Sequence, residues 1–537
     1  MVFKNSTLAK YVKNIKTSPR PLIANHRMLL TQALLALAGI PLCWDQGSSS
    51  TIPSLPGFQK DFGITSATNP GQVANFVSLV YIGAGVGAAL SFFLNDRVGR
   101  LWSFRIYAFV WIIGQMIAVG SQGNIATLYA ARIISGLGIG PLTVIGPVSL
   151  VEIAPAEIRG LLTSWFSVAM LLSLFLAAFA VYGYFNDMPA TTLQWQVPFF
   201  APALFMVLVI VASFFKSPRW LYLAGRDDEA TETLVLLRGL PIDHPRVQSE
   251  LADIRASVVK ERAAFGSAST YSLKGLHAVL RETFLVKSNL RRTQQAFISY
   301  ALAQLPGANS ITMYLAPVLG MVGIEGDASY SLFVTAMYSM SKFFFTLIAS
   351  FFFVDALGRR NRLFLGVTIQ MLSDTYIGVF IKFQQQGPVP TAAGQAALAA
   401  IFIHGLLILP YIFVSELWPN QIRSFGAALT QCFHWLFLFG VNKGVPSLLS
   451  STNNWGAFLF FAGWCFLALV YVFVSVPETA GVPLEKLDEL FEGPWWNQWR
   501  RSKSARMEVL DGERGEEDGT DESVVAVPGK TLKAGDV

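Results

Sequence analysis

One acidic residue stands alone in the first long apolar stretch of the chain. Asp45 is the only acid in residues 28–48, where it lies in the motif CWDQG. A low dielectric favours the neutral form of a carboxyl group, whereas a nearby arginine favours the charged form. Arg132, inside the apolar stretch 124–150, could act in this way. An acid balanced between the two effects can load and release a proton, so Asp45 is a candidate for proton coupling.

A second group of polar residues lies in the apolar stretch 295–322. It comprises the amides Gln304 and Asn309, the hydroxyl of Ser310 and the aromatic ring of Tyr314. A sugar needs several hydrogen-bonding side chains that converge in a cavity, together with aromatic faces against its C–H groups. We therefore predict that these four side chains contribute to a solute-binding site.

Two charged motifs occur twice, about 260 residues apart. DRVGR at 96–100 recurs as DALGRR at 355–360, and E-x-x-P-x-x-x-R occurs at 152–159 and again at 416–423. Such repeats build transporters that alternate access around a midplane site. Opposite charges at these helix ends could lock the two halves together; the alternative is topology charge with weak exposed pairing. The predicted gate consists of Asp96, Arg97, Arg100, Glu152, Arg159, Asp355, Arg359, Arg360, Glu416 and Arg423.

These residues require membrane-spanning helices to position them. The chain of 537 residues is 53% hydrophobic and only 14% charged, with a mean hydropathy of +0.48; soluble proteins carry about 25% charged residues. The composition predicts an all-α membrane protein and argues against a soluble enzyme. Hydropathy predicts twelve spanning segments, at 28–48, 72–94, 101–121, 124–150, 160–184, 193–215, 295–322, 330–354, 362–383, 393–416, 425–448 and 455–476.

The distribution of basic residues orients these segments. Lys and Arg cluster in the N-terminal arm, the 97–105 turn, the 216–292 stretch and the 359–362 turn, whereas several intervening loops have none. By the positive-inside rule both termini and the 216–292 stretch are cytoplasmic. We predict an N-terminal arm at 1–27, a six-helix half at 28–215, a helical linker at 216–292, a second half at 293–476 and a tail at 477–537 that is disordered toward its end.

The paired turns, together with SPRWL at 217–221 and PET at 477–479, resemble the sugar porter family of the major facilitator superfamily. The resemblance covers residues 28–492 and is nearest to fungal members that import sugars, sugar acids or quinate. It implies twelve helices in two halves, and an Asp45–Arg132 pair that couples transport to protons. Facilitative members lack the acid.

The resemblance also extends the predicted binding site, although its usual sugar-contact set is only partly present. Tyr411 stands where the family often has Trp, and Ser167 stands where it usually has Gln. His434, which precedes Trp435, stands where the family usually has Asn. His434 is either a packing residue or a partner for a solute carboxylate. Asn442 and Lys443 follow toward the outer end of the same segment.

The leading hypothesis is a plasma-membrane transporter that imports a sugar or sugar-like polyhydroxylated solute by proton symport. An uncoupled facilitative carrier and a transporter-like nutrient sensor are the alternatives. No phosphate-binding loop, metal-ligand cluster or nucleophile–base pair suggests an enzyme, a cofactor or a metal. The expected partners are the solute, protons and the lipid bilayer but no nucleic acid, and we expect a monomer. The solute itself is not identified by the sequence.

Overall fold

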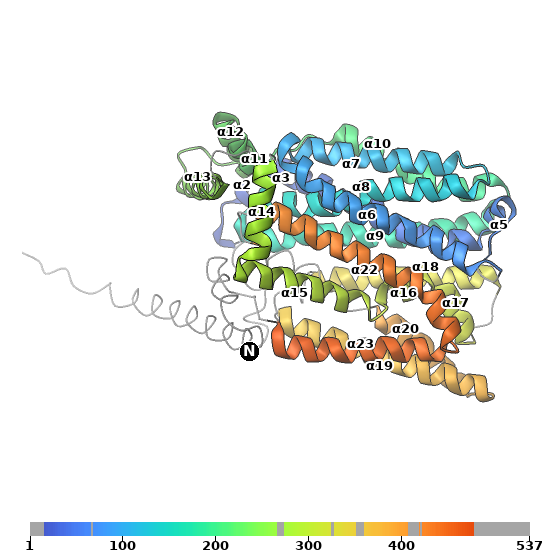
Figure 1. Ribbon diagram of the computed structural model, residues 1–537. Helices are drawn as coiled ribbons and strands as arrows, with labels where there is room; N and C mark the ends of the chain where they lie inside the picture. The colour runs from blue at the N-terminus through green and yellow to red at the C-terminus, as the bar shows by residue number, and fades with distance from the viewer. Residues whose placement is uncertain are drawn as a thin grey trace, which may run out of the picture.

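The computed structural model describes residues 16–65, 68–265, 273–323, 327–350, 359–405, 418 and 422–476. Every regular element in these ranges is a helix, and the long helices run side by side in one bundle (Figure 1). The predicted site residues Tyr411, Asp355 and Glu416 lie outside the described residues, as does the predicted tail.

Six spans form the N-terminal half. In the first span, the 3-10 turn η1 (Leu37–Gly39) joins α3 (His26–Ala36) to α4 (Ile40–Ser49). All six spans are long and apolar enough to cross a membrane. The other five are α6 (Pro70–Val98), α7 (Arg100–Val119), α8 (Ile125–Ile153), α9 (Arg159–Asp187) and α10 (Thr192–Ala212).

Short polar caps define where several of these helices begin. The Asn124 side chain accepts hydrogen bonds from the first amides of α8, and Asn25 does the same for α3. Such caps satisfy amides that have no partner within the helix. The helices extend past the predicted segments, as α6 at 70–98 does beyond 72–94, because hydropathy detects only the apolar part of a span.

Small helices connect and flank the N-terminal spans. Those that follow α10 lie at one end of the bundle, which we call the linker side; we call the opposite end the loop side (Figure 1). The linker helices are α11 (Pro218–Leu223), α12 (Asp227–Arg238), α13 (Pro245–Phe265) and α14 (Leu273–Leu285). The other short elements are α2 (Arg20–Ile23), η2 (Ile52–Ser54), α5 (Pro56–Phe62) and η3 (Ala156–Ile158).

The C-terminal half begins with a broken span. The predicted segment 295–322 is divided into α15 (Lys287–Gln304), α16 (Ala308–Met313) and α17 (Leu315–Met321). Gly307 separates the first two with a φ of +82°, a backbone conformation that favours glycine. The remaining helices are α18 (Ala328–Ile348), α19 (Arg359–Gln386), α20 (Thr391–His404), α22 (Arg423–Ser451) and α23 (Trp455–Ser475).

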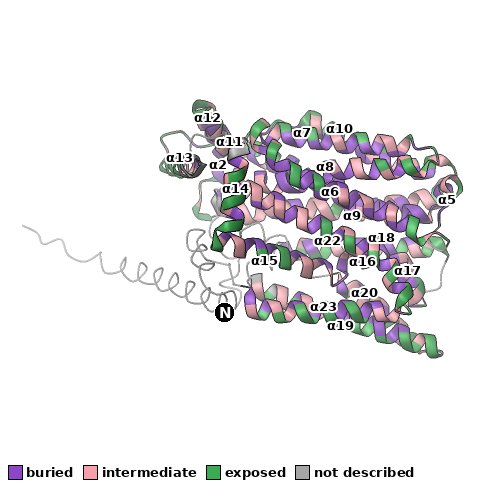
Figure 2. Cartoon of the chain, viewed as in Figure 1, coloured by how far each residue is buried: buried purple, intermediate pink, exposed green. Residues whose placement is uncertain are grey.

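The helix count agrees with the predicted fold. Ten described helices are long and apolar enough to span a membrane, and α20 is a shorter apolar helix. With the broken span α15–α17 they account for the twelve predicted segments. Large apolar side chains such as those of Leu208 and Phe473 are exposed, as lipid-facing helices require. Figure 2 shows exposed positions along the spanning helices.

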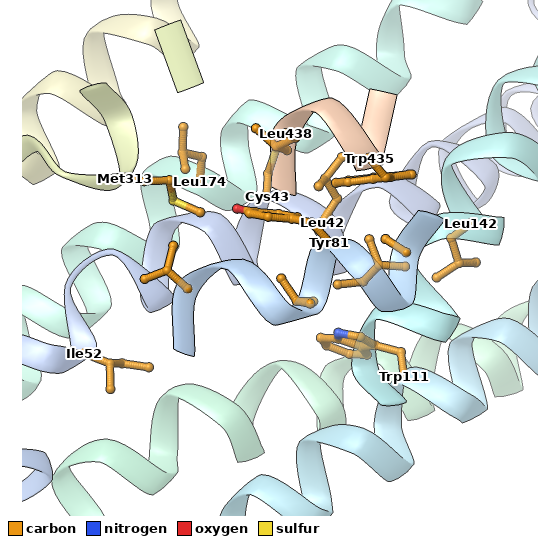
Figure 3. Close-up of a cluster of buried hydrophobic side chains, with 14 of the residues drawn as sticks. Leu42, Cys43, Ile52, Tyr81, Trp111, Leu142, Leu174, Met313, Trp435 and Leu438 are labelled. Carbon is orange, nitrogen blue, oxygen red and sulfur yellow. The ribbon is translucent and has the colours of Figure 1, made fainter. Parts of the chain in front are cut away.

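The two halves pack against each other through α6 with α22 and α9 with α18. The main apolar cluster draws residues from both halves. Figure 3 shows Leu42, Cys43 and Tyr81 of the N-terminal half beside Met313 and Leu438 of the C-terminal half. The core of the bundle therefore lies at the boundary that an alternating-access movement would open.

Candidate functional site

The structure brings Asp45 and Arg132 together. Both guanidinium Nη atoms of Arg132 bond to the carboxylate, Nη1 to Oδ1 and Nη2 to Oδ2, the latter at 3.0 Å. Their side chains are 3% and 1% exposed, so this pair is excluded from solvent. Ser49 adds a weak contact to Asp45 Oδ1 at 3.5 Å. A bidentate pair of this kind fixes both distance and orientation.

Close packing of α6 and α8 positions the arginine. A Cβ atom at Gly136 or Gly140 of α8 would overlap a backbone oxygen of α6. Arg132 lies four residues before Gly136, on the same face of the helix. Its Nε therefore reaches the Phe76 carbonyl oxygen of α6 at 2.8 Å, and its guanidinium lies 5.0 Å from the Phe76 ring centroid.

A buried chain of hydrogen bonds joins three of the predicted solute-binding residues. Asn309 Nδ2 donates to Gln304 Oε1 at 2.8 Å, and Gln304 Nε2 lies 3.0 Å from His434 Nδ1. The break at Gly307 turns the chain so that the side chains on either side of it meet. Gln304 and His434 are 3% and 1% exposed. The three residues form one polar network between α15, α16 and α22.

Trp435 connects this network to the N-terminal half. Its ring packs edge-on against His434 at 4.8 Å and stacks on Tyr81 of α6 at 5.8 Å (Figure 3). Its Nε1 also donates to Thr143 Oγ1 of α8 at 3.3 Å. A residue that contacts both halves is well placed to respond to a solute between them.

Two further residues of this region are buried with unused hydrogen-bonding capacity. Ser310 Oγ and both polar side-chain atoms of Asn442 have no hydrogen-bond partner among the described residues. Tyr314 donates from its hydroxyl to the Asn442 carbonyl oxygen at 3.0 Å. Buried polar groups normally find partners, so these groups are candidates for contact with a solute. Ser167 is half-buried on α9, with no described contact that joins it to this network.

At the linker side, the predicted gate residues of the N-terminal half form a compact ion network. Arg100 bonds to Asp96 and makes two bonds to Glu152, at 3.0 and 2.7 Å. Ser217, at the start of the linker, donates to Glu152 at 2.7 Å. These contacts lie within the N-terminal half and its linker. Arg97 is exposed and has no ion pair with a described residue.

Residues that the sequence analysis did not select fasten the linker to the nearby end of α8 and to η3. Arg238, which is 1% exposed, makes two bonds to Glu250 at 2.9 and 2.6 Å and one to the Ile153 carbonyl oxygen at 2.9 Å. Arg246 donates to Glu157 at 2.7 Å. Burial alone would raise the pKa of Glu157, but the hydrogen bond and charge of Arg246 lower it overall. Arg159 interacts electrostatically with this group of charges.

The predicted gate residues of the C-terminal half, which repeat those of the N-terminal half, lie only partly within the described residues. Arg360 donates to the Phe473 carbonyl oxygen at 2.7 Å, and Arg423 begins α22. Asp355, Glu416 and the side chain of Arg359 fall outside the described positions. The lock between the two halves therefore stays a prediction.

Three ionisable residues of the C-terminal half were missed, of which two are fully buried and one is partly buried. His404 Nε2 of α20 lies 3.2 Å from Asp374 Oδ1 of α19, with both side chains fully buried. Lys342 of α18 donates to Thr312 of α16 at 2.9 Å. Asp374 is the only acid in the segment 362–383 and Lys342 the only charged residue in 330–354. The reasoning that singled out Asp45, an isolated charge in an apolar segment, would have found both.

Twelve helices in two halves, with polar networks at their boundary, define a membrane transporter of the major facilitator type. The model of the family described as "Sugar (and other) transporter" matches residues 31–491. This chain belongs to that family. The membership confirms the resemblance drawn from the repeated turns and identifies the chain as a transporter and not an enzyme.

Curated relatives and solved structures agree with this assignment. The chain is 27% identical over 498 residues to the quinate permease of Emericella nidulans, covering 90% of this chain and 92% of the relative. It is 28% identical to a probable quinate permease of Aspergillus terreus, covering 88% and 89%. The fold resembles a structure of the proton:xylose symporter XylE, with a TM-score of 0.72, 21% identity, and coverage of 87% of this chain and 100% of the other.

Proposed function

We propose that this protein is a secondary active transporter that imports a sugar or sugar-like polyhydroxylated solute together with a proton. The observation that carries the proposal is the buried Asp45–Arg132 pair. Ionisable groups inside a membrane bundle are costly and mark ion or proton pathways by default. A carboxylate that already holds a counter-charge can be neutralised by one proton, and this changes the attraction between α4 and α8.

Protonation of Asp45 would weaken the pair without releasing Arg132 entirely. Arg132 would keep its bond to the Phe76 carbonyl oxygen of α6, so α4 is the element that gains freedom. Cys43, two residues before Asp45, belongs to the apolar cluster at the boundary of the halves (Figure 3). A shift of α4 therefore reaches the surface along which the halves would rock.

The solute would bind at the network of Gln304, Asn309 and His434. Amides and an imidazole offer both donors and acceptors, which suits the hydroxyl groups of a polyhydroxylated solute. The relatives are named as quinate permeases and the structural neighbour as a proton:xylose symporter. These likenesses support a small hydroxylated solute and proton coupling.

We place the protein in the plasma membrane as a monomer, with the linker side and both termini in the cytoplasm. The basic loops at that end support this orientation. The ion network around Arg100 and Glu152 would hold the linker side of the N-terminal half together in one conformation. Its predicted counterpart around Arg423 would do the same in the other half.

The test is uptake into transporter-deficient yeast or proteoliposomes with an imposed pH gradient. We expect concentrative uptake that a protonophore abolishes. In Asp45→Asn, which resembles the protonated form, accumulation should be lost while exchange of labelled for unlabelled solute continues. Accumulation by Asp45→Asn at the wild-type level would refute coupling through Asp45. Wild-type uptake that never exceeds equilibrium would instead indicate an uncoupled carrier.

A further inference from the structure

Lys342 is an isolated cation in the interior of the bundle. It is the only charged residue of α18, and its ammonium group is partly buried. Nζ donates to Thr312 Oγ1 at 2.9 Å and lies 5.4 Å from the centroid of the Tyr338 ring. A lysine ammonium has three donors. No carboxylate among the described residues lies within 4.0 Å of it.

The position of Lys342 places it beside the proposed solute site. Thr312 is on α16, the short helix that also carries Asn309 of the polar network. One residue further along α18, Phe343 stacks on Phe175 of α9 with ring centroids 5.9 Å apart. The helix that carries Lys342 therefore packs along the boundary of the two halves.

A glycine at the end of α20 leaves room for the Lys342 side chain. A Cβ atom at Gly405, just after α20, would lie 3.2 Å from Lys342 Cγ and 2.9 Å from the Tyr338 hydroxyl oxygen. The aliphatic stem thus packs tightly while the ammonium points to hydroxyl and aromatic groups. These groups hold a cation in place, but they supply no negative charge. An unpaired charge in a membrane interior is unfavourable, and an anionic ligand would remove that penalty.

We propose that Lys342 binds a carboxylate of the transported solute, so that the substrate class is a polyhydroxylated carboxylic acid rather than a neutral sugar. This assignment rests on the proposed transport function and narrows it. The solute would be held at two kinds of group: its carboxylate by Lys342, and its hydroxyls by Gln304, Asn309 and His434. Lys342 would then act as the residue that determines specificity for the acid.

Matched solutes test the assignment directly. Galacturonate and galactose differ only in a carboxylate or a hydroxymethyl group at one carbon, and quinate can be compared with myo-inositol. The full chain in liposomes is loaded with unlabelled solute, and the exchange of labelled solute is measured, because exchange does not require proton coupling. We expect at least one acid to exchange with an apparent affinity about 10-fold or more above that of its neutral counterpart.

Two variants and a control locate this preference. Lys342→Met should lower the apparent affinity for the acid by about 10- to 100-fold and leave that for the neutral counterpart nearly unchanged. Lys342→Arg should keep most of the preference, since it keeps the charge. Lys382→Met is the matched control, because Lys382 also lies over an aromatic ring, that of Trp455 at 4.8 Å, but on the exposed surface of α19. It should behave as wild type.

Each outcome bears on a different proposal. Wild type that exchanges the neutral solutes as readily as the acids would overturn the role of Lys342 and leave the proposed function standing. An unchanged acid preference in Lys342→Met would do the same. If Lys342→Met does not reach the membrane, the preference of wild type and of Lys342→Arg decides the question. A protein that exchanges no member of either class would overturn both proposals.

Discussion

Each half of the bundle contains a buried aspartate next to a basic side chain on another helix. In the N-terminal half, Asp45 of α4 receives both Nη atoms of Arg132 on α8. In the C-terminal half, Asp374 of α19 has a single contact with His404 of α20 at 3.2 Å. Cys465 of α23 lies 3.9 Å from the other carboxylate oxygen of Asp374. The first pair contains a permanent cation, since arginine keeps its proton in proteins.

The second pair differs in chemistry and in place. Histidine, unlike arginine, can be neutral, so a contact between an aspartate and a histidine does not require two opposite charges. The helices that carry these residues pack against each other, and α19 also packs against α23, all in one half. Asp45, in contrast, lies on α4, which packs against α9 of its own half and against α16 of the other half. Under the proposed mechanism, a buried acid is coupled to movement only where its helix meets the boundary between the halves.

The largest effect is expected from Arg132→Met. It leaves the Asp45 carboxylate buried without its counter-charge, which costs about 3–5 kcal/mol. The variant should therefore unfold at a markedly lower temperature in detergent and transport nothing. The double variant Asp45→Asn with Arg132→Met should recover much of the stability, because no unpaired charge remains. A single variant as stable as wild type would contradict the idea that this pair is ionic.

The next prediction sets the two aspartates against each other. Asp45→Asn should abolish accumulation of the solute, whereas Asp374→Asn should retain it and lower the free energy of unfolding by about 1–3 kcal/mol. Both variants replace one carboxyl group by an amide and keep the shape of the side chain. Concentrative uptake and thermal unfolding are measured in parallel. Loss of accumulation in Asp374→Asn, at normal exchange rates, would assign a role in coupling to the C-terminal pair as well.

The polar network of Gln304, Asn309 and His434 should affect the affinity for the solute and not the coupling to protons. Gln304→Ala or Asn309→Ala removes a hydrogen-bonding group and should weaken solute binding by about 1–3 kcal/mol. The ratio of accumulated to external solute at saturating concentration should stay unchanged. His434→Asn keeps a polar group of smaller size and should weaken the binding of acidic and neutral solutes alike, since His434 is assigned to the hydroxyl groups. Unchanged affinity for both kinds of solute would make His434 a packing residue.

A smaller effect is expected at the linker side. Arg159→Ala and Arg423→Ala should each slow uptake several-fold, with most of the protein still in the membrane, because each begins a span of the proposed gate. Arg27→Ala is the control, since Arg27 is exposed on the same side, next to the linker, and is not a predicted gate residue. Normal uptake in both arginine variants would remove the gate from the mechanism. Surface expression is measured for each.

The smallest effect concerns the attachment of the linker. Arg246→Ala breaks a partly exposed ion pair with Glu157, worth at most about 1 kcal/mol. Because the folded-state pKa of Glu157 is lowered, this pair contributes at neutral pH and is lost as the pH falls below the ordinary range of glutamate. Limited proteolysis of the linker should therefore be faster in Arg246→Ala at neutral pH, and the difference from wild type should shrink in acid.

Most of the fold was predictable because a membrane imposes simple rules. Apolar segments of about 20 residues must be helices, and the repeated charged turns indicate two homologous halves. The break in the segment 295–322 is encoded locally by Gly307. Helix ends were less predictable. In α6, for example, polar residues such as Asn95 and Asp96 extend the helix beyond its apolar part.

For the site, the sequence by itself determined which isolated polar residues must be buried in apolar helices: Asp45, Arg132, Gln304 and His434. Only the tertiary structure decided which of them meet. A side chain's partner depends on how two helices approach and rotate, and that is set by contacts such as those of Gly136 against α6. For the same reason only the folded chain distinguishes Lys342, whose ammonium donates to Thr312 of α16, from an exposed lysine such as Lys382.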